Sequence, residues 1–97
     1  MSDVDIVDEL FAVIEDRRDS LPADSYTTSL FTHERGQNAI LEKIGEESTE
    51  VILAAKDENE AEVVAESADL IYHLFVLLAH HDIELGELTD ELEARRG

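Results

Sequence analysis

The stretch that decides the fold is Gln37–His81, QNAILEKIGEESTEVILAAKDENEAEVVAESADLIYHLFVLLAHH. Its apolar residues recur every three or four positions, which is typical of amphipathic helices and not of strands. The polar run Asp57–Glu60 interrupts this pattern, so we expect one helix from about Gln37 to Lys56 and another from about Ala61 to His81. Because the connection between them is short, the two helices are predicted to form an antiparallel hairpin.

The rest of the chain is also predicted to lack strands. Apolar spacing indicates a helix over about Asp3–Arg18, then an ordered, hydroxyl-rich loop over Ala23–Arg35, and a last helix over about Leu85–Arg95 that serves as a lid or a dimer contact. Residues 68–79 are apolar on nearly every side, which predicts a position at the centre of a bundle. We therefore expect one all-α domain, residues 1–97, that is a helical bundle and a dimer.

The composition excludes several classes of function. Seven Lys and Arg against 25 Asp and Glu give a net charge of −18, which disfavours nucleic acid and membrane surfaces as partners. The absence of cysteine excludes disulfides and thiolate metal sites. The longest apolar run, Leu74–Ala79, is far shorter than the roughly 20 residues of a membrane span. We expect a cytoplasmic protein whose acidic surface is suited to concentrated salt, as in halophilic proteins.

Four carboxylates occupy mirrored positions in the predicted hairpin. Glu47 and Glu50 share one helix face, and Glu66 and Asp69 share a face of the next helix at the same spacing. The pairs Glu47–Asp69 and Glu50–Glu66 are each symmetric about residue 58, in the middle of the connection. All four side chains are therefore expected at one height, facing one another. Carboxylates between apolar helices repel one another unless a cation compensates them, and Lys43 alone cannot neutralise four charges. Oxygen ligands of this kind suit Mg²⁺ and suit zinc poorly.

Two other interpretations remain open. On so acidic a chain these acids can simply face solvent, although Asp69 and His73 interrupt an otherwise apolar helix and so favour a site. His73 either orients a ligand carboxylate or touches a phosphate, or it is a buried histidine bound to Asp69 or Glu66. The sequence contains no Walker loop, no G-x-G-x-x-G and no Ser/His/Asp arrangement.

The run Glu46-Glu47-x-x-Glu50, followed by Glu66-x-x-Asp69, resembles the EExxE…ExxD signature of the all-α nucleoside triphosphate pyrophosphohydrolases, the MazG-like superfamily. Further residues between about 25 and 92 resemble the phosphoribosyl-ATP pyrophosphohydrolases of histidine biosynthesis. These residues are Ser25-Tyr26-Thr27, Leu30, Gly36, Ile40, Lys43, Gly45-Glu46-Glu47, Ala68-Asp69-Leu70-Ile71-Tyr72-His73 and Val76-Leu77-Leu78.

The resemblance implies a MazG-like helical homodimer that uses Mg²⁺ to hydrolyse the α–β phosphoanhydride of phosphoribosyl-ATP, giving phosphoribosyl-AMP and pyrophosphate. It implies a catalytic role for Glu46 and Glu47, without saying which acid is the general base. The implied metal ligands are Glu47, Glu50, Glu66 and Asp69. The expected substrate contacts are Ser25, Tyr26, Thr27, Arg35, Lys43, Tyr72 and His73.

The chain departs from the family pattern in two places. The spacing from Leu30 to Gly36 is two residues longer than expected, and Ala39 stands where Lys or Arg is common. One phosphate contact is therefore either missing or supplied by Arg35. Two competing functions stay open: a house-cleaning pyrophosphohydrolase that acts on free or damaged nucleotides, and a non-enzymatic helical dimer whose acids serve solubility.

Overall fold

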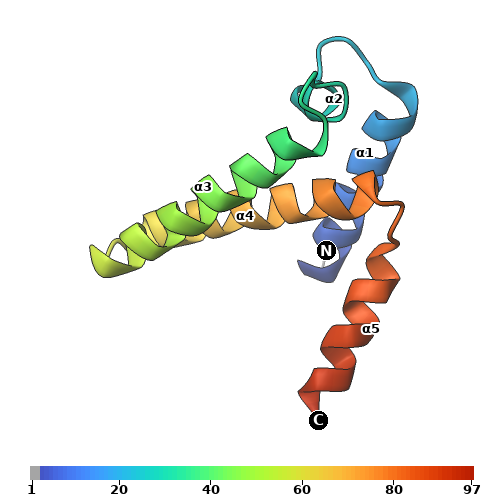
Figure 1. The fold of residues 1–97 in the computed structure, drawn as a ribbon. Coiled ribbons are helices and arrows are strands. Elements are labelled where there is room, and N and C mark those ends of the chain that lie inside the picture. The colour runs from blue at the N-terminus through green and yellow to red at the C-terminus, as the bar shows by residue number, and fades with distance from the viewer. Residues whose placement is uncertain (1–2) are drawn as a thin grey trace.

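The computed structural model describes the backbone of residues 3–97 and the side chains of residues 6–97. This part of the chain contains no strand, so the all-α prediction is confirmed. Most helix ends lie within one or two residues of the predicted positions. The helices, labelled in Figure 1, are α1 (Asp3–Ser20), α2 (Tyr26–Phe31), α3 (Gln37–Lys56), α4 (Glu60–His80) and α5 (Leu85–Arg96).

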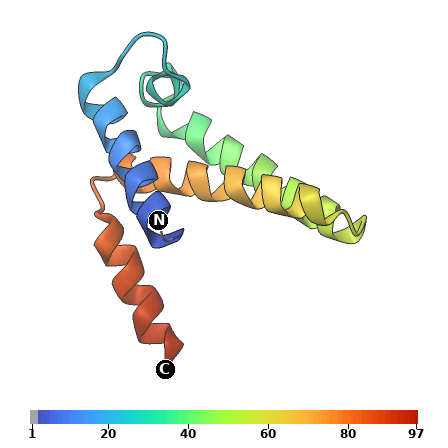
Figure 2. The same ribbon diagram turned by 180° about the vertical axis from the view of Figure 1, so that it is seen from behind.

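The two longest helices form the predicted hairpin. α3 and α4 lie side by side and antiparallel in both views (Figures 1 and 2). α3 ends as the backbone N–H of Asp57 donates to the Leu53 carbonyl at 3.0 Å, and Glu58 turns the chain with a φ of +56°. Asn59 then caps α4 by accepting a hydrogen bond from the Glu62 backbone N–H at 3.1 Å. This tight connection fixes the register between the two helices.

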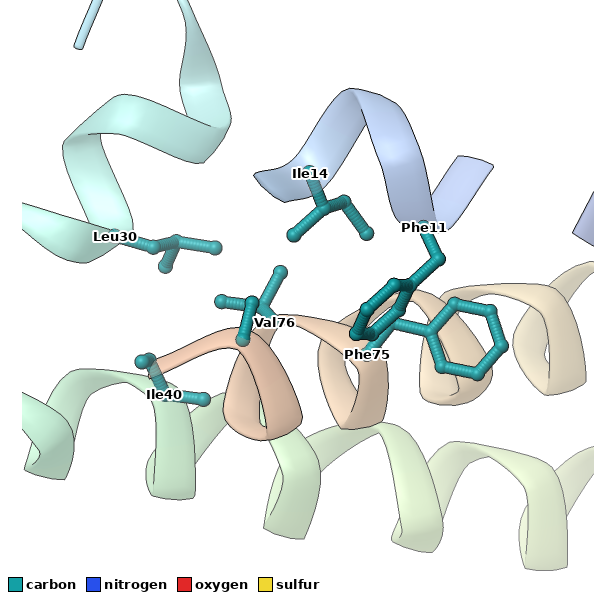
Figure 3. Packing of buried hydrophobic residues seen from close by; sticks show 7 residues of the cluster. Phe11, Ile14, Leu30, Ile40, Phe75 and Val76 are labelled. Atoms are coloured by element: carbon teal, nitrogen blue, oxygen red, sulfur yellow. The ribbon is translucent and has the colours of Figure 1, made fainter. Parts of the chain in front are cut away.

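The hydrophobic core lies at the end of the hairpin remote from its connection. There α1 crosses the C-terminal half of α4, and α2 covers the start of α3 (Figure 1). Six side chains from these four helices point toward one another in Figure 3: Phe11, Ile14, Leu30, Ile40, Phe75 and Val76. The rings of Phe11 and Phe75 meet edge to face with centroids 5.5 Å apart. The core therefore holds α2 at the open end of the hairpin, beside the start of α3.

The prediction of a loop over Ala23–Arg35 is wrong for the six residues of α2. Ser25 is the N-cap of this helix, and its hydroxyl accepts a hydrogen bond from the Thr28 backbone N–H at 3.2 Å. Thr27, Thr28 and Leu30 are buried. A helix this short is not stable alone in water, so packing against α1, α3 and α4 stabilises it. The hydroxyl-rich composition concealed a capped helix with one buried face.

The prediction that residues 68–79 lie at the centre of a bundle is only half met within one chain. His73, Phe75, Val76 and Ala79 are buried, but another face of α4 is open to solvent. On that face Val64, Ile71 and Leu74 are 70%, 46% and 38% exposed. α5 projects away from the hairpin in both views (Figures 1 and 2) and leaves Leu92 exposed. A single chain therefore leaves α4 partly uncovered.

By length and composition alone, α4 is apolar enough to cross a membrane, and only 22% of its most apolar window is buried. Such a helix is weak evidence for a membrane span. Two carboxylates, Glu66 and Asp69, lie near its middle and close to α3. Moving ionisable side chains at this position into a bilayer would cost much free energy.

Candidate active site

Three carboxylates converge where α3 and α4 run side by side. Glu47 from α3 and Glu66 and Asp69 from α4 each offer an oxygen, and these oxygens all lie within 4.8 Å of one another. Glu47 is only 6% exposed, Glu66 is half-buried, and Asp69 is exposed. The fourth predicted acid, Glu50, is outside this group of three but lies beside Glu66, with which it can share a hydrogen bond. The structure thus brings three of the four predicted acids together and has Glu50 beside one of them, Glu66.

The closeness of these acids changes the protonation of Glu66. Its pKa rises from 4.5 to about 7, chiefly because of a hydrogen bond shared with Glu50, then because of burial and the hydrogen bond with Glu47. Those hydrogen bonds need a proton on Glu66; while the acids are ionised, the buried oxygens Glu47 Oε2 and Glu66 Oε2 have no donor within the described part of the chain. Buried carboxylate oxygens without a donor are costly in a folded protein. A cation between the helices would satisfy both.

Glu46 and Lys43 lie at the edge of the carboxylate group. Lys43 Nζ is 3.3 Å from Glu46 Oε2 and 4.0 Å from Glu47 Oε1. The Glu46 side chain is 60% exposed and is not one of the three converging acids. The hydrogen bond to Glu46 is the main reason that the pKa of Lys43 is raised. One lysine therefore joins the buried acid Glu47 to an acid that faces solvent.

A pocket of about 270 Å³ adjoins this edge. Arg35 and Lys43 are its cationic side chains, and both are paired with acids: Arg35 with Glu42, and Lys43 with Glu46. Ala39, which stands where the family commonly has Lys or Arg, also lines this pocket. Arg35 and Ala39 therefore border the same space. The complete lining is Tyr26, Ser29, Leu30, His33, Arg35, Ala39, Glu42, Lys43 and Glu46. We call it the α2–α3 pocket.

Of the seven predicted substrate contacts, the structure brings three to the α2–α3 pocket: Tyr26, Arg35 and Lys43. Sequence reasoning missed Ser29 and His33. Once Tyr26–Phe31 is known to be a helix, Ser29 is expected on the same face as Tyr26, because the two are three residues apart. No pattern in the sequence distinguishes His33, which follows α2 in a turn.

The other four predicted substrate contacts have partners within the protein. Ser25 caps α2, and the buried Thr27 hydroxyl is hydrogen-bonded to the Tyr72 hydroxyl. His73 is 5% exposed, with its Nδ1 2.8 Å from the Asp69 carbonyl and its Nε2 3.0 Å from Tyr26 Oη. The sequence left open whether a buried His73 is bound to Asp69 or to Glu66. The structure shows it bound to Asp69, through the main-chain carbonyl.

Comparison with known proteins agrees with this geometry. The family model described as phosphoribosyl-ATP pyrophosphohydrolase matches residues 7–96. The phosphoribosyl-ATP pyrophosphatase of Haloarcula marismortui is 61% identical over 95% of this chain and 94% of its own. The protein of that name from Haloquadratum walsbyi is 63% identical over 93% and 90%, and that from Methanocella arvoryzae is 52% identical over 95% and 97%. The chain therefore belongs to the phosphoribosyl-ATP pyrophosphohydrolase family, within the MazG-like superfamily.

Proposed function

We propose that this chain hydrolyses phosphoribosyl-ATP to phosphoribosyl-AMP and pyrophosphate in histidine biosynthesis, with Mg²⁺ bound by Glu47, Glu66 and Asp69. Membership of the family supports the reaction. The observation that carries the site is the buried carboxylate of Glu47, which has an oxygen without a hydrogen-bond donor and lies within 4.8 Å of two further carboxylates. Glu50 completes the set beside Glu66.

The residues present fit a magnesium ion. All donors are carboxylate oxygens, which Mg²⁺ prefers, and exposed Asp69 leaves room for water and substrate phosphates on the open side of the group. Bound Mg²⁺ would supply charge neutralisation for the triphosphate and would acidify the attacking water. Glu66, whose pKa of about 7 favours a proton in the absence of a cation, must be ionised to bind the metal.

The substrate would approach through the α2–α3 pocket. Lys43 stands between this pocket and Glu47, so its ammonium is placed to contact the phosphates beside the metal group. Arg35 is placed to contact a phosphate at the opposite side of the pocket once it leaves Glu42. Glu46, outside the metal group and largely exposed, is the acid placed to accept the proton of the attacking water.

The proposal includes a homodimer of single-domain chains. The open face of α4 carries Val64, Ile71 and Leu74, and the neighbouring residues Ile52 and Leu53 of α3 are 61% and 56% exposed. A soluble protein seldom leaves so many large apolar side chains uncovered along one hairpin. α5 projects from the body with Leu92 exposed and can cover part of a second copy (Figure 2). The net charge of −18 supports folding and assembly in a cytoplasm rich in salt.

The test of the proposed function is a substrate panel in molar KCl with Mg²⁺. Pyrophosphate release is measured with phosphoribosyl-ATP, ATP, dATP and dUTP at equal concentrations. We expect phosphoribosyl-ATP to be the preferred substrate by kcat/KM. Preferred hydrolysis of the ordinary triphosphates would instead assign the site to a house-cleaning enzyme. No release of pyrophosphate from any of them by a folded protein would overturn the enzymatic proposal.

A further inference from the structure

His73 has two ring nitrogens and a protein partner at each of them. Nδ1 lies 2.8 Å from the main-chain carbonyl of Asp69, which can only accept, so Nδ1 carries a proton and donates it. In the neutral ring Nε2 is then an acceptor, and the Tyr26 hydroxyl at 3.0 Å donates to it. Both bonds are protected from solvent, because His73 is 5% exposed. The ring is therefore not available to contact a substrate.

These two bonds connect the metal group to the substrate pocket. Asp69 contributes its carboxylate to the metal group and its carbonyl to His73. Tyr26 is the first residue of α2 and lines the α2–α3 pocket, with half of its surface exposed. Its ring stacks beside Tyr72 with centroids 6.3 Å apart. The chain Asp69–His73–Tyr26 thus sets where one wall of the pocket stands relative to the metal ligands.

α2 needs such a connection. It has six residues, and an isolated helix of that length does not persist in water. Burial of Thr27, Thr28 and Leu30 seats it on the core, but this burial does not fix the rotamer of the half-exposed Tyr26. The hydrogen bond that the Tyr26 hydroxyl donates to the buried imidazole does fix it, because the ring is held at both nitrogens and cannot turn without losing a partner.

We propose that His73 is a positioning residue for substrate binding: through Tyr26 it holds the wall of the α2–α3 pocket at a fixed place relative to Asp69. The inference rests on the proposed function, because it takes this pocket as the place where the nucleotide substrate binds. It changes the role expected of His73 from a substrate contact to a residue that acts through another side chain.

Two variants remove the connection from opposite ends. Tyr26→Phe keeps the ring and loses the hydroxyl, and His73→Asn keeps a donor near the Asp69 carbonyl but no longer reaches Tyr26. We expect each to raise KM for phosphoribosyl-ATP about fivefold, the effect of about one net hydrogen bond, with kcat changed less than about twofold. The Mg²⁺ concentration needed for half-maximal activity should not change, because the carboxylates are untouched. The double variant should be no worse than the worse single variant, because both changes remove one bond.

Thr32→Ala is the matched control. The Thr32 hydroxyl donates to the Thr28 carbonyl at 2.9 Å at the end of α2, so its loss weakens α2 without touching Tyr26. We expect this variant to lower Tm but leave KM unchanged. An equal rise in KM in Thr32→Ala, additive effects in the double variant, or an unchanged KM in Tyr26→Phe would each overturn the positioning role.

A measurement without turnover separates this inference from the proposed function. In the protein labelled with ¹⁵N-histidine, the spectrum of His73 should show a protonated Nδ1 and an unprotonated Nε2, and Tyr26→Phe should shift the Nε2 resonance. A proton on Nε2 in place of Nδ1 would refute the connection even if the enzyme is active. The expected spectrum in a folded protein that releases no pyrophosphate would refute the proposed function, and the positioning role with it.

Discussion

The stabilisation by Mg²⁺ should depend on Glu47 and not on its neighbour Glu46. In molar KCl, we expect Mg²⁺ to raise the Tm of the wild-type protein, because it binds the folded carboxylate group and not the unfolded chain. At a free concentration of about one hundred times Kd, binding stabilises the folded state by about 2.7 kcal/mol. For a chain of this size, each kcal/mol raises Tm by about 4–8 °C, so the expected shift is about 10–20 °C.

Glu47→Gln should abolish this shift, because it removes the buried carboxylate from the group of three. It should change the Tm without Mg²⁺ much less. The lost attraction to Lys43 at 4.0 Å and the lost repulsion from Asp69 within 4.8 Å have opposite signs. Each is at most about 3–4 kcal/mol at an effective dielectric constant of about 20, and solvent screening reduces both, because Asp69 is exposed and Lys43 is partly exposed.

The assay is thermal unfolding followed by circular dichroism, with and without Mg²⁺, at constant KCl. Glu46→Gln is the matched control: it removes an equal charge one residue away, from a side chain that is exposed and outside the group. We expect Glu46→Gln to keep the Mg²⁺ shift in full. Equal shifts in wild type and Glu47→Gln, or equal losses in both variants, would refute the assignment of Glu47 as a specific ligand and would indicate diffuse binding to an acidic surface.

Four further predictions concern the pH response, the dimer, the core and α2. Without divalent cations, the stability contributed by Glu66 should be full below about pH 4.5 and lost as the pH rises through about 7. Between these values Glu66 keeps its proton in the folded chain and has released it in the unfolded chain. Glu66→Gln should therefore flatten the slope of Tm against pH. Ile71→Glu should halve the mass measured by light scattering while helicity is retained; a monomeric wild type would contradict the dimer. Ile40→Ala should cost about 2–5 kcal/mol in chemical denaturation, and Ile6→Ala less than about 0.5 kcal/mol, because Ile40 is fully buried and Ile6 is 56% exposed. Ser25→Ala should cost about 1 kcal/mol in the same experiment, through loss of the α2 cap; no change would mean that the cap does not stabilise α2.

The hairpin and its acids could be predicted from the sequence because both follow from helical arithmetic. Apolar spacing placed α3 at the residues found, and the short connection fixed which positions of α4 oppose it. Glu47, Glu66 and Asp69 met as the mirrored spacing required. The register of a tight hairpin depends only on the two helices and the short connection between them, so it can be predicted from a single sequence.

The α2 region could not be predicted in the same way, because its structure depends on tertiary contacts. Ser25 and its neighbouring hydroxyls are equally compatible with a loop and with a capped helix, and only burial against the core decides between them. The hydroxyl groups that bond to His73 and Thr27, those of Tyr26 and Tyr72, lie more than forty residues away in the sequence, on other helices. Their roles therefore became visible only when α2 was placed against α4.

The apolar character of α4 could be predicted from composition, but the surface that covers its exposed face could not. Composition shows that Val64 and Ile71 need a partner surface, and it does not show whether that surface belongs to the same chain. Within the described residues their exposed face is left open by the other helices, which is why the dimer is a proposal.

The most direct test of the central claim is the Mg²⁺ dependence of pyrophosphate release from phosphoribosyl-ATP by wild type and by Glu47→Gln, both folded in molar KCl. We expect pyrophosphate release by wild type to rise to saturation with Mg²⁺ and to stop in EDTA. Glu47→Gln should lose at least about a hundredfold in kcat/KM, because a carboxylate central to the metal site is removed. Full activity of the wild type in EDTA, or an unimpaired Glu47→Gln, would contradict the assignment of the carboxylate group as the catalytic metal site.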